Sequence, residues 1–590
     1  MLVLPKVNEK PGLNAYPVLY WNHVGLEMNR ITHSLGGPQG GPTMSSRALG
    51  LLHLAMHDAF FATLGHTETS DPPTWLPNAQ RPPVPAGVAA TLDSANAALT
   101  AAAMTILDAL YGRTGPGVSR LARETLEQMR TRMVADYPHH IDTLSPAHRY
   151  GIRIANLLHD RLAVAEGEPG ADGLRYEPRL GRYYFRDEPQ HPVRLEDIDP
   201  DDPSKGQRAV RIYHGPYYGT TVRDFAVTDP DGHRVAKWPE GTPEYDAALE
   251  EVRRSGGAAH LGSTDRTPDQ TVAAIYWAYD GANLIGTPPR LYNQILRTIV
   301  WDKLGLQEAG PDDQKTTEQL VRLFALANVA MADAGKYAWK EKYRFELWRP
   351  LSGIREHDPS AEQDDEKSGT AKLVAGADPF WLALGAPDTN SNRISFKPPF
   401  PAYPSGHATF GAACFQIARL YLASIDKATV SDPNGPDNIA FSFVSEELNG
   451  VSRDLHQPHD PNRPIEDQPG LVRTYVKRSF NSLWRAMWEN AFSRIWLGVH
   501  WRFDAFDFAD ADDGTGAYKD ADAMTYSNVW TTKRAPDAPD SDLPTGGIPL
   551  GLGIANDIWD NKMRAPTNTV QGTRLFQAVQ SKISKTTLRP

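Results

Sequence analysis

The stretch FPAYPSGHATFGAACFQIARLY, residues 400–421, places two prolines just before a run with apolar residues at helical spacing. A residue that precedes proline is pushed out of the helical region, so a long helix is predicted to begin directly after Pro404. Ser405, Gly406 and His407 then occupy its first turn, where backbone N–H groups have no intrahelical partner and the helix dipole is positive. The stretch therefore predicts a site for an oxyanion, although Ser405 could simply cap the helix and His407 could be a surface histidine.

Helical periodicity also dominates the rest of the chain, and strand-like alternation is rare. Residues 170–265 differ, since they are rich in Pro, Gly, Tyr and charge and show few clean periods. Long amphipathic helices with little else must bury their apolar stripes on one another, which predicts an all-α fold of two four-helix-bundle-like cores with long irregular surface loops. We expect an N-terminal helical region, 1–266, with an irregular excursion at 170–265, and a C-terminal catalytic region, 267–590. The segments predicted to be helical are 45–64, 92–112, 117–137, 145–167, 267–286, 288–306, 316–350, 406–421 and 469–501.

Composition limits the classes of function. With 40% hydrophobic and 23% charged residues the chain is typical of a soluble globular protein, and its net charge of −11 disfavours nucleic-acid binding. The one cysteine, Cys414, excludes an internal disulfide and is expected to be a small buried hydrophobe. No signal peptide or membrane-spanning run is visible, so we expect a soluble protein with no membrane partner, and the compartment stays open.

Two further segments carry cations that could meet the same anion. Lys342 and Arg349 are seven residues apart, which returns to nearly one face of a helix, and Pro350 is expected to place Arg349 at the helix end. A guanidinium there can grip an anion bidentately, although such pairs are usually solvated surface charges.

The segment SRIWLGVHWRFD, residues 493–504, adds a third cation and a histidine. Arg494 and His500 are six residues apart and would diverge on an unbroken helix, so Gly498 is expected to mark a bend that lets them converge. Asp504 follows His500 by four residues, a spacing that suits a carboxylate that orients an imidazole.

The three segments in this order resemble the signature of the superfamily that joins vanadium-dependent haloperoxidases to bacterial acid phosphatases and lipid phosphatases. FKPPFPAYPSGHATFG, SEELNGVSRDL, PIEDQPG and ENAFSRIWLGVHWRFD are similar, nearly word for word, to fungal-type vanadium chloroperoxidases. The resemblance implies an enzyme that oxidises chloride, and more easily bromide and iodide, with hydrogen peroxide to hypohalous acid. It also implies a vanadate cofactor, and we expect a monomer.

The resemblance also assigns roles to residues. His500 would bind vanadium directly and His407 would be the acid–base group. Trp339 and Phe400 would bind halide, and Asp280 in YWAYDG would pair with the arginines. The vanadate oxygens would accept hydrogen bonds from Lys342, Arg349, Ser405, Gly406 and Arg494. Lys342 would in addition draw electron density from the bound oxygens.

Two alternative functions stay open at this point. The same pocket could serve an acid phosphatase in which His500 attacks phosphorus and His407 protonates the leaving group. It could also belong to a phosphate- or vanadate-binding protein without activity. His53 and His57 have the i, i+4 spacing of a zinc pair but lack the accompanying glutamate, so packing is the better interpretation.

Overall fold

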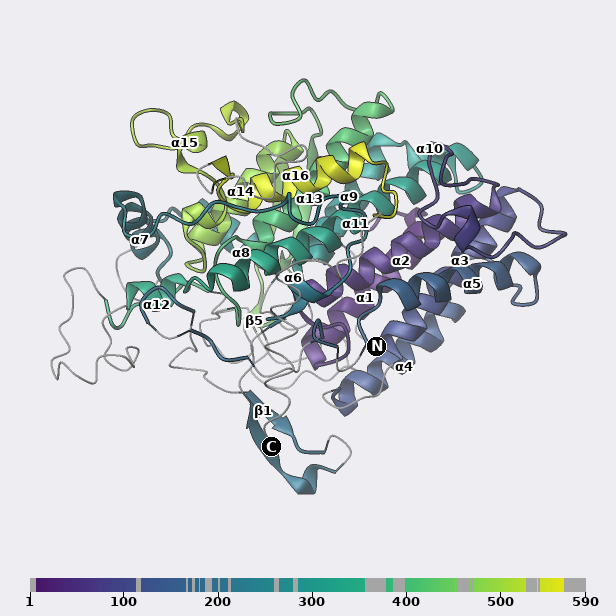
Figure 1. The fold of residues 1–590 in the computed structure, drawn as a ribbon, viewed down its shortest axis with the longest axis horizontal. Helices are drawn as coiled ribbons and strands as arrows, with labels where there is room; N and C mark the ends of the chain where they lie inside the picture. The colour runs from purple at the N-terminus through teal and green to yellow at the C-terminus, as the bar shows by residue number, and fades with distance from the viewer. Residues whose placement is uncertain are drawn as a thin grey trace.

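The computed structural model of the protein is mostly helical (Figure 1). The described strands form three two-stranded sheets, and no helix in the described part of the chain combines the length and hydrophobicity that a membrane span requires. The prediction of an all-α fold is therefore confirmed. The structure describes residues 7–112, 118–165, 168–171, 176–179, 181–185, 194–199, 202–210, 214–258, 265–279, 285–355, 378–385, 398–450, 453–454, 467, 471–526, 539 and 542–566.

The described residues form 16 α-helices and six strands. The helices that begin before residue 280 are α1 (Pro17–Leu35), α2 (Gly41–Thr63), α3 (Leu92–Tyr111), α4 (Arg120–Ala135), α5 (Pro146–Leu162), α6 (Tyr218–Thr221), α7 (Pro243–Ser255) and α8 (Pro268–Tyr276). The later ones are α9 (Pro288–Lys303), α10 (Leu306–Ala309), α11 (Gln314–Phe345), α12 (Pro350–Ile354), α13 (Gly406–Ser424), α14 (Leu483–Trp496), α15 (Phe508–Ala511) and α16 (Gly547–Asp560). The strands are β1 (Arg194–Asp197), β2 (Gln207–Val210), β3 (Phe441–Asn449), β4 (Arg453–Asp454), β5 (Leu471–Val472) and β6 (Tyr475–Phe480).

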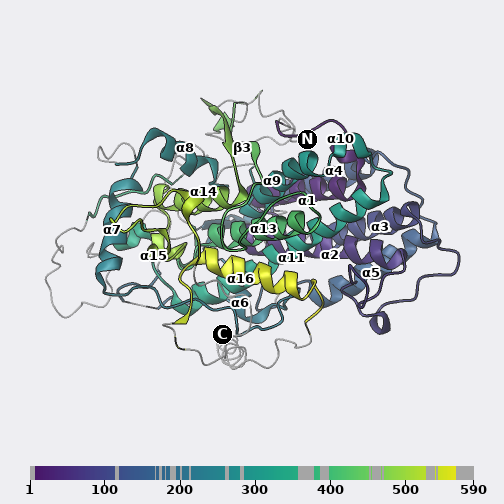
Figure 2. The same cartoon turned by 90° about the horizontal axis from the view of Figure 1, so that it is seen from above.

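Two groups of helices share the long helix α11. On one side α11 packs along α2, which in turn contacts α3 and α5. On the other side α11 packs on α13, which contacts α16, α14 and α9. Seen from above, α2, α11, α13 and α16 lie side by side through the middle of the molecule (Figure 2). The two expected bundle-like cores correspond to these two groups, with α11 common to both.

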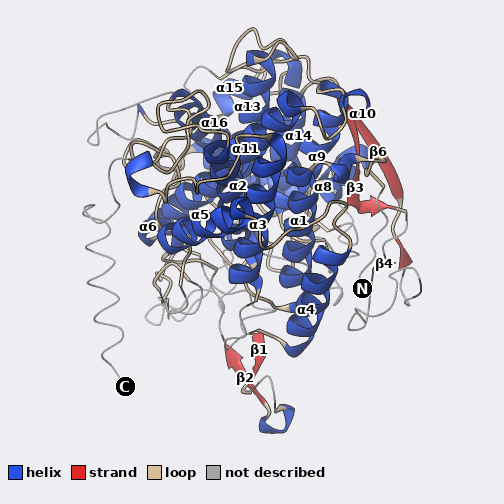
Figure 3. Cartoon of the chain, turned by 90° about the vertical axis from the view of Figure 1, so that its right-hand side faces the viewer, coloured by secondary structure: helices blue, strands red, loops and turns tan. Residues whose placement is uncertain are grey.

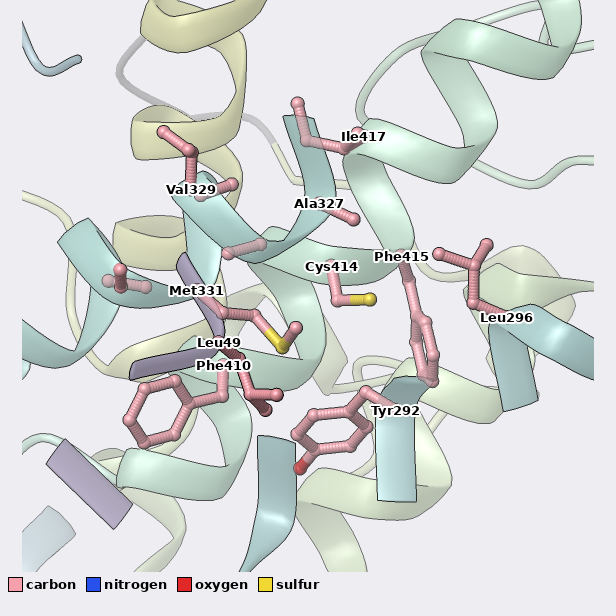
Figure 4. Close-up of a cluster of buried hydrophobic side chains, with 14 of the residues drawn as sticks. Leu49, Tyr292, Leu296, Ala327, Val329, Met331, Phe410, Cys414, Phe415 and Ile417 are labelled. Atoms are coloured by element: carbon pink, nitrogen blue, oxygen red, sulfur yellow. The ribbon is translucent and has the colours of Figure 1, made fainter. Parts of the chain in front are cut away.

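The shared core is apolar and includes residues from both sides of the expected boundary at residue 267. Figure 4 shows Leu49 of α2 and Met331 of α11 close to Phe410 and Cys414 of α13. Cys414 is fully buried, and this burial raises the pKa of its thiol. The expectation that Cys414 is a small buried hydrophobe is confirmed.

Two expectations for local structure are wrong. Residues 471–480 were expected to continue a helix to residue 501, but they form β5 and β6, and β6 pairs with β3 at one edge of the molecule (Figure 3). The side chains of β6 alternate in exposure, the period of a strand with one solvated face. The excursion expected to be irregular contains α7, where Thr242 caps the helix and Tyr245, Ala248 and Val252 form a buried stripe.

Candidate active site

The helix predicted from the opening stretch is α13, and its N-terminus forms the floor of the site. Ser405 is the N-cap residue, and its Oγ accepts a hydrogen bond from the N–H of Ala408 at 3.4 Å. A hydroxyl group that accepts one bond still has its own proton to donate, so capping does not use up Ser405. The N–H of Ser405 donates to the carbonyl of Asp504 at 2.7 Å, which joins this N-terminus to the short helix η7 (Arg502–Asp504).

Lys342 approaches this N-terminus from the last turn of α11 and is fully buried. Its Nζ donates to the carbonyls of Pro401, Ala402 and Pro404 at 3.0, 2.8 and 2.5 Å. These carbonyls belong to the extended segment that leads into α13. The ammonium group is therefore fixed beside the first turn of α13.

Arg349 reaches the same place by a route that the sequence did not indicate. We expected it at the end of the helix that carries Lys342, but α11 ends at Phe345, where Glu346 adopts a left-handed conformation with φ 53°. Arg349 is extended and is the N-cap residue of α12, since Pro350 disfavours a helical conformation just before it. Convergence of the two cations thus comes from the end of α11 and the extended conformation of Arg349, and not from helical periodicity.

The guanidinium of Arg349 links two parts of the site and is fully buried. Its Nε donates to the carbonyl of Phe400 at 3.0 Å. Its Nη1 donates to the carbonyl of Val499 at 2.9 Å and lies 3.1 Å from Nε2 of His500. Because arginine can only donate, Nε2 of His500 is the acceptor in this contact.

The bend predicted at Gly498 is confirmed. α14 ends at Trp496, two residues after the buried Arg494, and Gly498 is left-handed with φ 78°. A Cβ atom at this position would lie 2.2 Å from the carbonyl oxygen of Gly256, so only glycine allows the close approach. The turn carries His500 back toward Arg494, and the charge of Arg494 acts on this imidazole.

His500 is held in one neutral tautomer by its two hydrogen bonds. Its Nδ1 lies 2.7 Å from Oδ2 of Asp504, as the spacing predicted. Since Nε2 accepts from Arg349, Nδ1 carries the proton and donates it to the carboxylate. The lone pair on Nε2 therefore faces the cationic side of the site.

The pKa values agree with a neutral imidazole. Burial lowers the pKa of His500 well below its ordinary value, and the nearby positive charges lower it further. Burial raises the pKa of Asp504 to about 7, against the opposite effect of Lys342. Oδ2 of Asp504 also accepts from the N–H of Trp501 at 3.0 Å.

His407, in the first turn of α13, is buried and firmly oriented, so the alternative of a surface histidine is wrong. Its Nε2 lies 2.7 Å from the carbonyl of Ala278, which can only accept, so Nε2 carries a proton and Nδ1 is the other exchangeable position. The hydroxyl of Tyr292 and Nδ2 of Asn490 each donate to the carbonyl of His407 at 3.0 Å. Sequence reasoning missed Tyr292 and Asn490, and the only signal was a polar Asn490 within an apolar helix pattern.

Trp339 and Phe400 form an aromatic pair next to the cations. Their ring centroids are 4.7 Å apart with planes at 45°. Nζ of Lys342 lies 5.5 Å from the Trp339 ring and 5.3 Å from the Phe400 ring, and the guanidinium of Arg349 lies 4.8 Å from the latter. Cations and aromatic faces at such distances attract each other.

Three further residues were named from the sequence. Asp280 is outside the described residues. His53 and His57 belong to α2 and are buried. Nε2 of His53 bonds to Asn22, and Nδ1 of His57 bonds to Asp58. The described part of the chain contains no group of three His, Cys, Asp or Glu side chains placed to hold a metal ion.

The chain is similar to known proteins in sequence and in fold. The sequence model of the vanadium chloroperoxidase N-terminal domain matches residues 4–224, and that of the second helical-bundle domain of the same proteins matches residues 322–518. The chain is 43% identical to vanadium chloroperoxidase from Curvularia inaequalis, over 96% of this chain and 93% of the relative. Among solved structures it is similar in fold to a bacterial vanadium-dependent iodoperoxidase (TM-score 0.51, 16% identity, 94% of this chain and 98% of the other) and to a holo-type bacterial vanadium-dependent chloroperoxidase (TM-score 0.51, 15% identity, 90% and 94%).

Proposed function

This chain belongs to the vanadium chloroperoxidase family, and on that premise we propose that it is a vanadate-dependent haloperoxidase. Its reaction is the oxidation of chloride, and more easily of bromide and iodide, by hydrogen peroxide to hypohalous acid. The observation that carries the proposal is His500, which lies between Arg349 and Asp504 and whose pKa is lowered by burial and by the charges of the buried Arg349, Lys342 and Arg494.

The residues present fit vanadate. A tetrahedral oxyanion needs concentrated positive charge and N–H donors, which buried cations and a helix N-terminus supply. It also needs one ligand whose lone pair can bind the metal, and imidazole is suited to a transition metal. On binding, Nε2 of His500 would exchange its hydrogen bond from Arg349 for the bond to the metal. Once bound, vanadate supplies a Lewis acid at which hydrogen peroxide becomes reactive toward halide. The residues that would hold its oxygens are Lys342, Arg349, Ser405, Gly406 and Arg494.

His500 is the proposed metal ligand through Nε2. The Nδ1–H···Oδ2 bond to Asp504 keeps the proton off Nε2 and fixes the plane of the ring. The depressed pKa of His500 keeps the imidazole neutral, so that protons do not compete for the ligand position at mildly acidic pH.

His407 is the proposed acid–base group. Because its Nε2–H is bound to the carbonyl of Ala278, proton exchange with a bound oxygen would take place at Nδ1. The bonds of Tyr292 and Asn490 to the His407 carbonyl fix its backbone, which reduces the motion of the ring. Lys342 would add positive charge at the oxygen that halide attacks, and Asp280 would orient the arginines.

Trp339 and Phe400 are the proposed halide-binding residues. An aromatic pair beside two cations excludes water on one side and attracts an anion from the other. Partial loss of its hydration shell makes chloride more reactive.

The test compares two lysines of the same helix. Lys340 lies two residues before Lys342 but donates to the carbonyl of Pro230 at 2.8 Å, on the other side of α11 from the carbonyls that Lys342 binds. We expect Lys342→Ala to bind vanadate at least ~10-fold more weakly and to lose chloride oxidation, as expected for loss of a contact that orients the bound group. Lys340→Ala should match the wild type in both measurements.

Halogenation of monochlorodimedone with vanadate and peroxide is measured beside hydrolysis of an activated phosphomonoester by the metal-free protein. Vanadate-dependent halogenation supports the proposal. Phosphoester hydrolysis without halogenation would make the protein a phosphatase, and vanadate binding without either activity would leave only an anion-binding protein.

We also propose that residues 267–590 form the catalytic region, because every residue assigned above lies between 280 and 504. We further propose that the protein is a monomer. Light scattering during gel filtration should give a mass near 65.2 kDa.

A further inference from the structure

His214 joins the two proposed halide-binding residues through its backbone. Its N–H donates to the carbonyl of Pro399, the residue before Phe400, at 2.9 Å. Its carbonyl accepts from Nε1 of Trp339 at 3.0 Å and from the hydroxyl of Tyr343 at 2.7 Å. His214 thus fixes both the backbone just before Phe400 and the orientation of the Trp339 indole. The indole N–H is engaged in this hydrogen bond to the carbonyl of His214.

The imidazole of His214 packs on the same aromatic pair. Its ring centroid is 6.1 Å from that of Trp339, edge to face, and 6.0 Å from that of Phe400. The three rings form a triangle whose shortest side is the 4.7 Å between Trp339 and Phe400. The side chain of His214 is buried, so the ring shields this part of the pair from water.

The imidazole of His214 also packs against the first turn of α2. Its Nε2 lies 3.1 Å from Oγ1 of Thr43. At Gly41 a Cβ atom would come within 2.2 Å of the imidazole, so the glycine leaves the space that the ring fills. The imidazole therefore rests between the N-terminus of α2 and the aromatic pair, where a rotation would break a bond or a ring contact.

We propose that His214 is a specificity-determining residue of the halide site, which rests on the haloperoxidase function proposed above. Its backbone sets the spacing of Trp339 and Phe400, and its ring keeps water out beside them. Chloride holds its hydration water more tightly than bromide and is harder to oxidise. A halide site that is less tightly packed and more accessible to water should therefore lower kcat/KM for chloride more than for bromide.

The experiment measures steady-state kinetics with chloride and with bromide for His214→Ala, His214→Phe and a matched control. The control is His233→Ala, because His233 is also a buried histidine that packs on an aromatic residue of α11, Tyr337, but bonds to Asp557. For His214→Ala we expect the KM for chloride to rise ~10-fold and the ratio of kcat/KM for chloride to that for bromide to fall ~5–10-fold, the size of a single pocket contact. His214→Phe keeps a ring and should change the ratio by less than ~3-fold, and His233→Ala should leave it unchanged.

Chloride binding to the vanadate-free proteins, measured by the line width of 35Cl NMR, gives a second readout. It should weaken in His214→Ala, while vanadate affinity stays within ~2-fold of the wild type because the ring contacts of His214 described above are with Thr43 and the aromatic pair, and not with the residues proposed to hold vanadate. Thr43→Val, which keeps the side-chain shape and removes the hydroxyl, should shift the halide ratio in the same direction by a smaller factor. It replaces His214→Ala if that variant does not fold.

The possible results distinguish failure of the His214 proposal from failure of the proposed haloperoxidase function. An unchanged halide ratio in a folded His214→Ala or Thr43→Val protein would overturn the proposal, and so would a His214→Phe protein as impaired with chloride as His214→Ala. A wild-type protein without vanadate-dependent halogenation would instead overturn the proposed function, whatever the His214 variants do.

Discussion

Replacement of Asp504 tests the assignment of His500 most directly, because this carboxylate bonds to the imidazole and is not among the residues proposed to hold the vanadate oxygens. Oδ2 accepts from both Nδ1 of His500 and the N–H of Trp501, whereas Oδ1 is buried and has no hydrogen-bond partner among the described residues. An asparagine can therefore place its carbonyl oxygen at the Oδ2 position and keep both bonds. Its NH2 group would then be buried at the Oδ1 position without an acceptor.

These contacts set the expected magnitudes. In Asp504→Asn the tautomer of His500 is kept, so vanadate affinity should fall only ~10-fold, the lower end of the effect of losing a carboxylate behind a metal-binding histidine. The buried amide donors should cost about 1–3 kcal/mol of unfolding free energy. In Asp504→Ala nothing holds the Nδ1 proton, so the ring can turn and the affinity should fall ~100-fold.

Calorimetric titration of the metal-free variants with vanadate measures the affinities, and urea unfolding measures the stability. Lys340→Ala is the control for a buried substitution nearby that leaves the site intact. If Asp504→Ala bound vanadate within twofold of the wild type, Nε2 of His500 could not be the ligand held by this hydrogen bond. If Asp504→Asn were as weak as Asp504→Ala, the negative charge and not the tautomer would be what matters.

Three further outcomes follow from the same structure. His407→Ala should keep vanadate affinity within a few-fold but lower chloride turnover by ~10²–10⁴, the usual effect of removing a proton-transfer group, and unchanged turnover would remove it from the mechanism. Because the depressed pKa keeps His500 neutral as the pH falls, micromolar vanadate titrations of Asp504→Asn, whose amide does not titrate, should give affinities at about pH 7.5 and 5.5 within ~3-fold of each other, whereas a ligand of ordinary pKa would lose ~10-fold through protonation. In the wild type, protonation of Asp504, whose pKa is raised by burial to about 7, should add a further loss of affinity over the same pH range. Asp333 accepts from the three consecutive N–H groups of residues 225–227, so Asp333→Ala should cost ~3–5 kcal/mol in urea unfolding, and a loss below 1 kcal/mol would show that water replaces the carboxylate there.

Local sequence determined the features that depend on a few neighbouring residues. The prolines, Ser405 and Gly406 predicted where α13 begins, since they act on backbone angles and end groups within one turn. Gly498 predicted the bend after α14, and four-residue spacing predicted the bond between His500 and Asp504. The same local reasoning failed at residues 471–480, where the pairing of β5 with β4 and of β6 with β3 stabilises strands instead of a helix.

The tertiary structure decided which distant groups meet and in which chemical state. Arg349 joins Lys342 only because the chain turns at Glu346, and it fixes the tautomer of His500 from 151 positions away. The carbonyl of Ala278 orients His407, and His214 ties Trp339 to the approach to Phe400, through backbone atoms that every residue type possesses. Residue types, their spacing and the resemblance to a known family therefore predicted which side chains serve the site, while the partners that set their protonation and position came from packing, because a backbone carbonyl leaves no mark in a sequence.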